Sequence, residues 1–134
     1  MSGVGATTEP GLFSAFWARI KGEAELALAD IRKENPLLRA SSVRLGFGSE
    51  AKHDAIKPYL PSRPYYEKVL RASEPAIRAV MPSIWTPTEY FGRFLTDLAL
   101  GRYQDQLRAS KGIRMVGNMP IIENSAFRRL VEIK

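Results

Sequence analysis

Residues 16–47, which read FWARIKGEAELALADIRKENPLLRASSVRLGF, join a helical pattern to a strand pattern across one proline. Over Leu12–Glu34, apolar residues recur every three or four positions, which is typical of an amphipathic helix. Asn35 ends that helix, because the residue before a proline avoids helical backbone angles. The segment Leu38–Phe47 is apolar and partly β-branched and is closed by glycines, which predicts a short strand. A helix leading directly into a strand indicates an α/β fold.

The rest of the chain continues this alternation. We predict a helix over Tyr66–Met81 that is interrupted at Pro75. A second helix is capped by Thr86, has Pro87 and Glu89 in its first turn and ends near Gly101. A strand follows over Ile113–Val116, and a last helix is capped by Asn124 and runs through Leu130. Helices alternating with two or three short strands predict a helix-rich α/β fold. No change of composition divides residues 1–134, so we expect a single domain.

Composition narrows the possible functions. The chain has 134 residues, no cysteine and a single histidine, which excludes disulfides, thiolate metal sites and two-histidine metal sites. No run of about 18 apolar residues predicts a membrane span, and the N-terminal residues lack the pattern of a signal peptide. We therefore expect a cytoplasmic protein without a membrane partner. The formal net charge is +6, but basic and acidic residues are mixed along the chain, which makes nucleic acid an unlikely partner.

Lys21 lies just beside the apolar face that Trp17, Ala24 and Leu28 form on the first helix. In one interpretation its stem covers apolar surface while its ammonium reaches water and pairs with Glu25, one turn further on. In the other interpretation, the lysine belongs to a functional site.

Three segments support the functional interpretation. The segments SGVGAT at 2–7, WARIKGEAE at 17–25 and SVRLGF at 42–47, in this order, resemble the second half of short-chain dehydrogenase/reductases. The resemblance is closest to the atypical and extended branch, which includes NAD(P)-binding, epimerase-like proteins. The later helix start WTPTEY at 85–90 is also similar. The resemblance implies a partial Rossmann-like fold that contains only the second half.

The resemblance also implies roles for individual residues. Ser2 matches the serine that orients the substrate oxygen, and Lys21 matches the lysine that lowers the pKa of a catalytic tyrosine and holds the nicotinamide ribose. Arg44 and Gly46 lie in the segment that matches a strand-end turn near the cofactor. The implied catalytic residues are therefore Ser2, Trp17 and Lys21, and the implied cofactor-binding residues are Lys21, Arg44 and Gly46, with NAD or NADP as the cofactor.

Two features depart from the pattern of that superfamily. Trp17 stands at the tyrosine position, and an indole N–H donates a hydrogen bond but exchanges no proton near neutral pH. The Gly-rich turn that holds a dinucleotide pyrophosphate is missing from the sequence. We expect that the strand over Leu38–Phe47 and the apolar face of the first helix are thereby uncovered and invite association with a second copy or another protein.

The sequence thus supports more than one function. The first is an oxidoreductase-like protein of the short-chain dehydrogenase/reductase superfamily, which is inactive if Trp17 cannot replace the tyrosine. The second is a non-catalytic interaction or regulatory protein that associates through the uncovered sheet edge. A third is a small-ligand binding protein with a pocket beneath the proline-rich loop Ser49–Pro64. The substrate, the choice between NAD and NADP and the oligomeric state do not follow from the sequence.

Overall fold

A computed structural model describes residues 2–49, 53–59, 69, 72–81 and 84–133 of the chain. Its helices are α1 (Phe16–Glu34), α3 (Glu74–Val80), α4 (Thr88–Ala99), α5 (Gln104–Ala109) and α6 (Asn124–Leu130), with one 3₁₀ helix, η1 (Asp54–Tyr59). Its strands are β1 (Ser2–Gly3), β2 (Ser42–Leu45), β3 (Phe47–Ser49), β4 (Trp85–Pro87), β5 (Ile113–Val116) and β6 (Met119–Glu123). The α/β class that the sequence predicts is confirmed.

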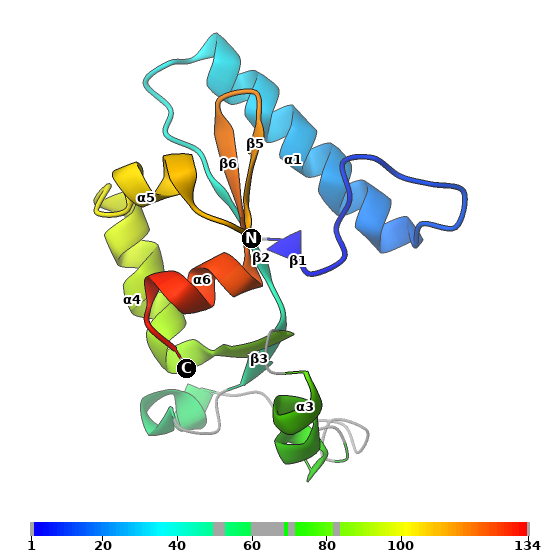
Figure 1. Ribbon diagram of the computed structural model, residues 1–134, viewed down its shortest axis with the longest axis vertical. Coiled ribbons are helices and arrows are strands. Elements are labelled where there is room, and N and C mark those ends of the chain that lie inside the picture. Colours follow the sequence, from blue (N-terminus) through cyan, green and yellow to red (C-terminus); the bar gives the residue numbers. More distant parts are fainter. Residues whose placement is uncertain (1, 50–52, 60–68, 70–71, 82–83, 134) are drawn as a thin grey trace.

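The strands form two sheets (Figure 1). The larger sheet has the order β1-β2-β6-β5, in which β1, β2 and β6 are parallel and β5 is antiparallel to β6. The smaller sheet pairs β3 with β4 in parallel. Strand β1, helix α1 and strand β2 therefore make a parallel β-α-β unit. Figure 1 shows α1 along one side of the larger sheet, with α4, α5 and α6 on the other side.

The strand predicted over Leu38–Phe47 is shorter than expected and divides at Gly46. A Cβ atom on Gly46 would lie 1.7 Å from the carbonyl oxygen of Ile84, so only glycine allows the two backbones to approach this closely. The Gly46 N–H also donates a hydrogen bond to Thr86 Oγ1 at 3.1 Å. These contacts turn the chain out of the larger sheet after β2 and into the smaller one.

Strand β6 lies at the centre of the core. The sequence does not predict this strand. Its residues Met119, Ile121 and Ile122 are fully buried. Ile121 packs with Ala29 of α1, whereas Ile122 packs with Phe94 and Phe127 on the opposite face. A short apolar run that contains a proline gives a weak strand signal, and burial on both faces removes the alternation that identifies a strand.

The apolar face that the sequence predicts for α1 is largely exposed, which agrees with the expectation that this face is uncovered. The apolar residues Phe16, Trp17, Ile20 and Ile31 are 79%, 48%, 47% and 52% exposed. The residues that face the sheet are small or charged, namely Ala18, Gly22, Glu25 and Ala29. The helix also begins at Phe16 rather than at Leu12, and it ends at Glu34 before Asn35-Pro36 as predicted.

Two predicted helix caps are wrong, because tertiary contacts use both side chains. Thr86 lies in β4, and its hydroxyl donates to Asn124 Oδ1 at 2.6 Å. The Asn124 amide group donates to the carbonyl oxygen of Trp85 at 3.3 Å. Helix α4 therefore begins after Pro87 and α6 after Glu123, and neither has a side-chain cap. Other predictions for these elements are confirmed. Helix α4 ends near Gly101, and strand β5 is present. The apolar residues of α4 pack inward, namely Phe91, Phe94, Leu95 and Leu98.

The expectation that β2 forms an uncovered edge is also wrong, because β2 lies between β1 and β6. Within the described strands, the edge next to α1 is the two-residue strand β1. Parts of the predicted loop over Ser49–Pro64 and of the predicted helix over Tyr66–Met81 lie outside the described residues. In the described part of that helix, α3 begins at Glu74 with Pro75 in its first turn.

Candidate functional site

Trp17 and Lys21 lie one turn apart on α1, and both side chains reach the carboxyl end of β1. The Nζ atom of Lys21 lies 3.4 Å from the position that a Cβ atom on Gly3 would occupy, and the Trp17 ring approaches the same position to 4.0 Å. The Trp17 ring also comes within 2.9 Å of the corresponding position on Gly5. Lys21 Nζ is 5.7 Å from the centroid of the Trp17 ring, which is a cation–π distance. An ammonium and an indole thus cover the backbone where β1 ends.

Small residues on α1 allow this arrangement. A Cβ atom on Gly22 would lie 1.7 Å from the carbonyl oxygen of Thr7, in the loop that follows β1. The Thr7 N–H donates a hydrogen bond to the carbonyl oxygen of Ala18 at 3.1 Å. Because the loop after β1 touches the helix backbone at these two points, the first turns of α1 are held directly over the end of the strand.

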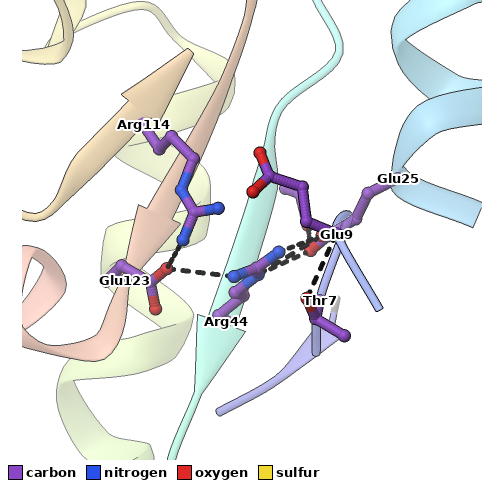
Figure 2. A network of polar contacts seen from close by, with 7 residues as sticks. Thr7, Glu9, Glu25, Arg44, Arg114 and Glu123 are labelled. Carbon is purple, nitrogen blue, oxygen red and sulfur yellow. Dashed lines mark hydrogen bonds and ion pairs between the residues drawn. The ribbon is translucent and has the colours of Figure 1, made fainter. Parts of the chain in front are cut away.

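A buried ion pair fixes the same face of α1 to the sheet, about one turn further along the helix. Arg44 Nη2 donates to Glu25 Oε2 at 2.6 Å and Arg44 Nε donates to Glu25 Oε1 at 3.1 Å, and both side chains are only 4% exposed. Ser42 Oγ donates to Glu25 Oε1 at 2.8 Å. On its far side Arg44 Nη1 donates to Glu123 Oε1 at 3.1 Å (Figure 2). This charge cluster, Glu25, Ser42, Arg44 and Glu123, links α1 to β2 and β6.

The cluster keeps both of its central groups charged. Burial would raise the pKa of the Glu25 carboxyl, but hydrogen bonds from Arg44 and Ser42 and the positive charge of Arg44 outweigh it, and the pKa lies below its ordinary value of 4.5. The hydrogen bond to Glu25 raises the pKa of Arg44 against the opposing effect of burial, and Glu123 adds to the rise. Neither group is in a state that would exchange protons near neutral pH.

Acid should therefore destabilise the protein through Glu25. A carboxylate whose pKa is lowered by folding contributes stability above its unfolded pKa, and that stability is lost as the pH falls through the folded value. We expect the free energy of unfolding, measured in urea at a series of pH values, to fall below about pH 4.5 and to fall less steeply in Glu25→Gln. Glu34→Gln, at the exposed end of the same helix, should keep the wild-type slope. A wild-type slope in Glu25→Gln as well would contradict this assignment.

The structure separates the five residues that the sequence singles out. Trp17 and Lys21 come together at the end of β1. Ser2 lies on the same strand, but its Oγ atom is buried. Arg44 is buried within the charge cluster, where it pairs with Glu25 and Glu123. Gly46 forms the close backbone contact with Ile84.

Glu25 is the central residue of the charge cluster, and its role is not predicted from the sequence. The sequence suggests a pair with Lys21, but both Glu25 oxygen atoms bind Arg44, and one of them also binds Ser42. The available signal was the spacing of Ala18, Gly22, Glu25 and Ala29, which places three small residues and one glutamate on a single helical face. A charge among small residues marks a close contact with a polar partner. Lys21 consequently keeps its ammonium free of Glu25.

Among the described residues, no helix is long and apolar enough to cross a membrane. No protein-family model and no solved structure matches the chain. The chain is similar to botcinic acid biosynthesis cluster B protein 16 from Botryotinia fuckeliana (strain B05.10). The two sequences are 37% identical over 135 aligned positions, which cover 98% of this chain and 83% of that protein.

Proposed function

This chain belongs to one protein family with botcinic acid biosynthesis cluster B protein 16, and we propose that it is an oxidoreductase-like protein of the short-chain dehydrogenase/reductase superfamily. The name of the relative places that protein in a botcinic acid biosynthesis cluster. In this proposal Lys21 binds the nicotinamide ribose, with NAD or NADP as the cofactor.

The position of Lys21 supports this proposal more than any other observation. In open α/β sheets, ligands bind beyond the carboxyl ends of the parallel strands. The unit β1-α1-β2 is parallel, and Lys21 Nζ lies beside Gly3 at the carboxyl end of β1. Because Gly3 has no side chain, the ammonium and a ligand can both approach the backbone there.

The chemistry of the three implied catalytic residues favours binding over proton transfer. The Lys21 ammonium has three N–H donors, which suit the hydroxyl oxygens of a ribose. The Trp17 indole donates a hydrogen bond but supplies no proton near neutral pH. Ser2 Oγ is buried, so it reaches a substrate oxygen only after a local rearrangement. A bound nicotinamide cofactor supplies hydride chemistry, while the protein positions the reactants.

The described residues fit only part of such a cofactor. They offer a lysine for the ribose, but none of the described strand-to-helix turns has the Gly-rich sequence that holds a pyrophosphate. The Arg44 guanidinium, which the resemblance implies as a cofactor contact, is held by Glu25 and Glu123. In our proposal, a second chain supplies the pyrophosphate contacts.

The decisive test is a titration of the protein with NADH and NADPH, followed by nicotinamide fluorescence. We expect saturable binding by the purified wild-type chain, with the site completed by self-association, and loss of that binding in Lys21→Ala. Lys33→Ala on the same helix removes an equal charge from an exposed position and should bind as the wild type does. Both variants should unfold at wild-type urea concentrations.

The outcomes of this titration separate the two candidate functions. Unchanged binding in Lys21→Ala would contradict the role of the lysine. No binding to the wild type at millimolar cofactor, with or without added partner protein, would contradict the oxidoreductase-like function. That result together with stable association with another protein would favour the second candidate.

The second candidate is a non-catalytic interaction protein, and the outer face of α1 favours it. Phe16, Ile20 and Ile31 lie on one stripe of the helix and are about half exposed or more. The sheet is covered by the opposite face, through Gly22 and Glu25. A continuous apolar stripe on a helix already packed through its other face is typical of an interaction site.

A further inference from the structure

A second polar site lies at the other end of β2, where its first residues follow the connection from α1. A cavity of about 300 Å³ opens there between the last turn of α1, the connection after it, the end of α4, and α5. Its charged lining consists of Arg32, Arg39 and Arg108, with Ser41 and Gln104 as neutral hydrogen-bonding groups. None of the residues described as lining this cavity is acidic. Figure 1 shows the connection after α1 running past α5 on the way to β2.

The three arginines differ in what they bind. Arg32 Nη1 donates to the carbonyl oxygen of Ala40, which fixes the connection that carries Arg39. Within the described part of the chain, the side chains of Arg39 and Arg108 have neither a hydrogen-bond partner nor an ion-pair partner, and both residues are exposed. Three like charges around one cavity repel each other, and an anion that enters it relieves that repulsion.

The same cavity has an apolar wall. Leu98, Leu107, Pro36 and Pro120 contribute to its lining. An inorganic anion would use only the arginines, whereas a molecule with a short hydrocarbon part would also remove apolar surface from water. A volume near 300 Å³ corresponds to the small end of the range found for ligand pockets, about 300–1,000 Å³.

We propose that this cavity binds a small organic acid, whose carboxylate or phosphate lies between Arg39 and Arg108 and whose apolar part lies against Leu98 and Leu107. A guanidinium group presents paired N–H donors that match the geometry of either oxyanion. Ser41 and Gln104 provide further donors at the rim. The site lies at the opposite end of β2 from Lys21, so its occupancy does not depend on the proposed nicotinamide site.

The test uses isothermal titration of the full chain, without nucleotide, with four probes: hexanoate, hexyl phosphate, inorganic phosphate and 1-hexanol. We expect saturable binding of hexanoate, of hexyl phosphate or of both, weaker binding of inorganic phosphate, and none of 1-hexanol. A preference between the two organic anions identifies the head group. Each of Arg39→Gln and Arg108→Gln should weaken the binding of the organic anion at least tenfold.

Arg129→Gln provides the matched control, because it removes the same charge from an exposed position on α6 outside the cavity. Arg129→Gln should bind the organic anion as tightly as the wild type does. Lys21→Ala should do so too, which distinguishes a failure of this proposal from a failure of the proposed nicotinamide site. Absence of saturable binding by both organic anions would overturn the proposal, as would equal binding in Arg39→Gln, Arg108→Gln and the wild type. Inorganic phosphate binding as tightly as hexyl phosphate would overturn the role of the apolar wall.

Discussion

Replacing Arg44 with methionine should lower the free energy of unfolding by about 3–5 kcal/mol, because it leaves the Glu25 carboxylate buried without its cation. Glu25 and Arg44 are each 4% exposed and are joined by hydrogen bonds of 2.6 and 3.1 Å. Removing one partner of such a pair costs more than the pair itself contributes, since the desolvation of the remaining charge is no longer offset. Urea denaturation followed by tryptophan fluorescence measures the change.

Two further variants make this expectation specific. Arg114→Met removes a half-exposed arginine that lies 3.9 Å from Glu123, and it should change the stability by no more than about 1 kcal/mol. The double variant Glu25→Leu/Arg44→Met removes both buried charges and should recover much of the stability that Arg44→Met loses. If Arg44→Met were as stable as Arg114→Met, the cluster would not be a buried ion pair in solution.

Replacing Gly22 with alanine should also destabilise the protein, by about 1–3 kcal/mol, although alanine is the better helix former. In the middle of a helix, glycine normally costs about 0.5–1 kcal/mol relative to alanine. At Gly22 the added Cβ would lie 1.7 Å from the carbonyl oxygen of Thr7, so the loop after β1 would have to move away from α1. The close contact therefore reverses the sign of the stability change that helix propensity predicts for Gly22→Ala.

Gly92 in α4 is the matched control for this substitution. It is exposed, and an added Cβ would meet no atom within 4 Å. Gly92→Ala should therefore stabilise the protein by about 0.5–1 kcal/mol, as propensity alone predicts. A gain in stability from Gly22→Ala, measured in the same urea titrations, would show that α1 does not approach the loop as closely as the structure indicates.

These two contacts also bear on the proposed nicotinamide site. Gly22 sets the distance between α1 and the end of β1, and Glu25 anchors the next turn of the same helix to β2. Trp17 and Lys21 precede both residues on α1, so their positions over Gly3 depend on this packing. A change at Gly22 should consequently disturb ligand binding at Lys21 without altering the lysine itself.

Structural features that depend on residues close together in the chain were predicted correctly from the sequence. The end of α1 before Asn35-Pro36, the apolar face of α4 and its end near Gly101 all follow from proline restriction and helical periodicity. Strand β5 and the overall α/β class were also predictable. The placement of Trp17 and Lys21 on one helix, one turn apart, required no tertiary information.

Local patterns in the sequence are sufficient for helices α1, α4 and α6, for strands β2 and β5, and for the amphipathic character of α1. Which face of α1 is buried depends on tertiary contacts. Periodicity identifies an apolar face but not the surface that covers it. Here the buried face carries Gly22, whose backbone closely approaches the loop after β1, and Glu25, which binds Arg44 on β2. Arg44 on β2 likewise has a buried carboxylate partner only because α1 folds over it. That partner, Glu25, lies 19 residues earlier in the chain. Such partners are set by contacts between distant segments, which no local pattern contains.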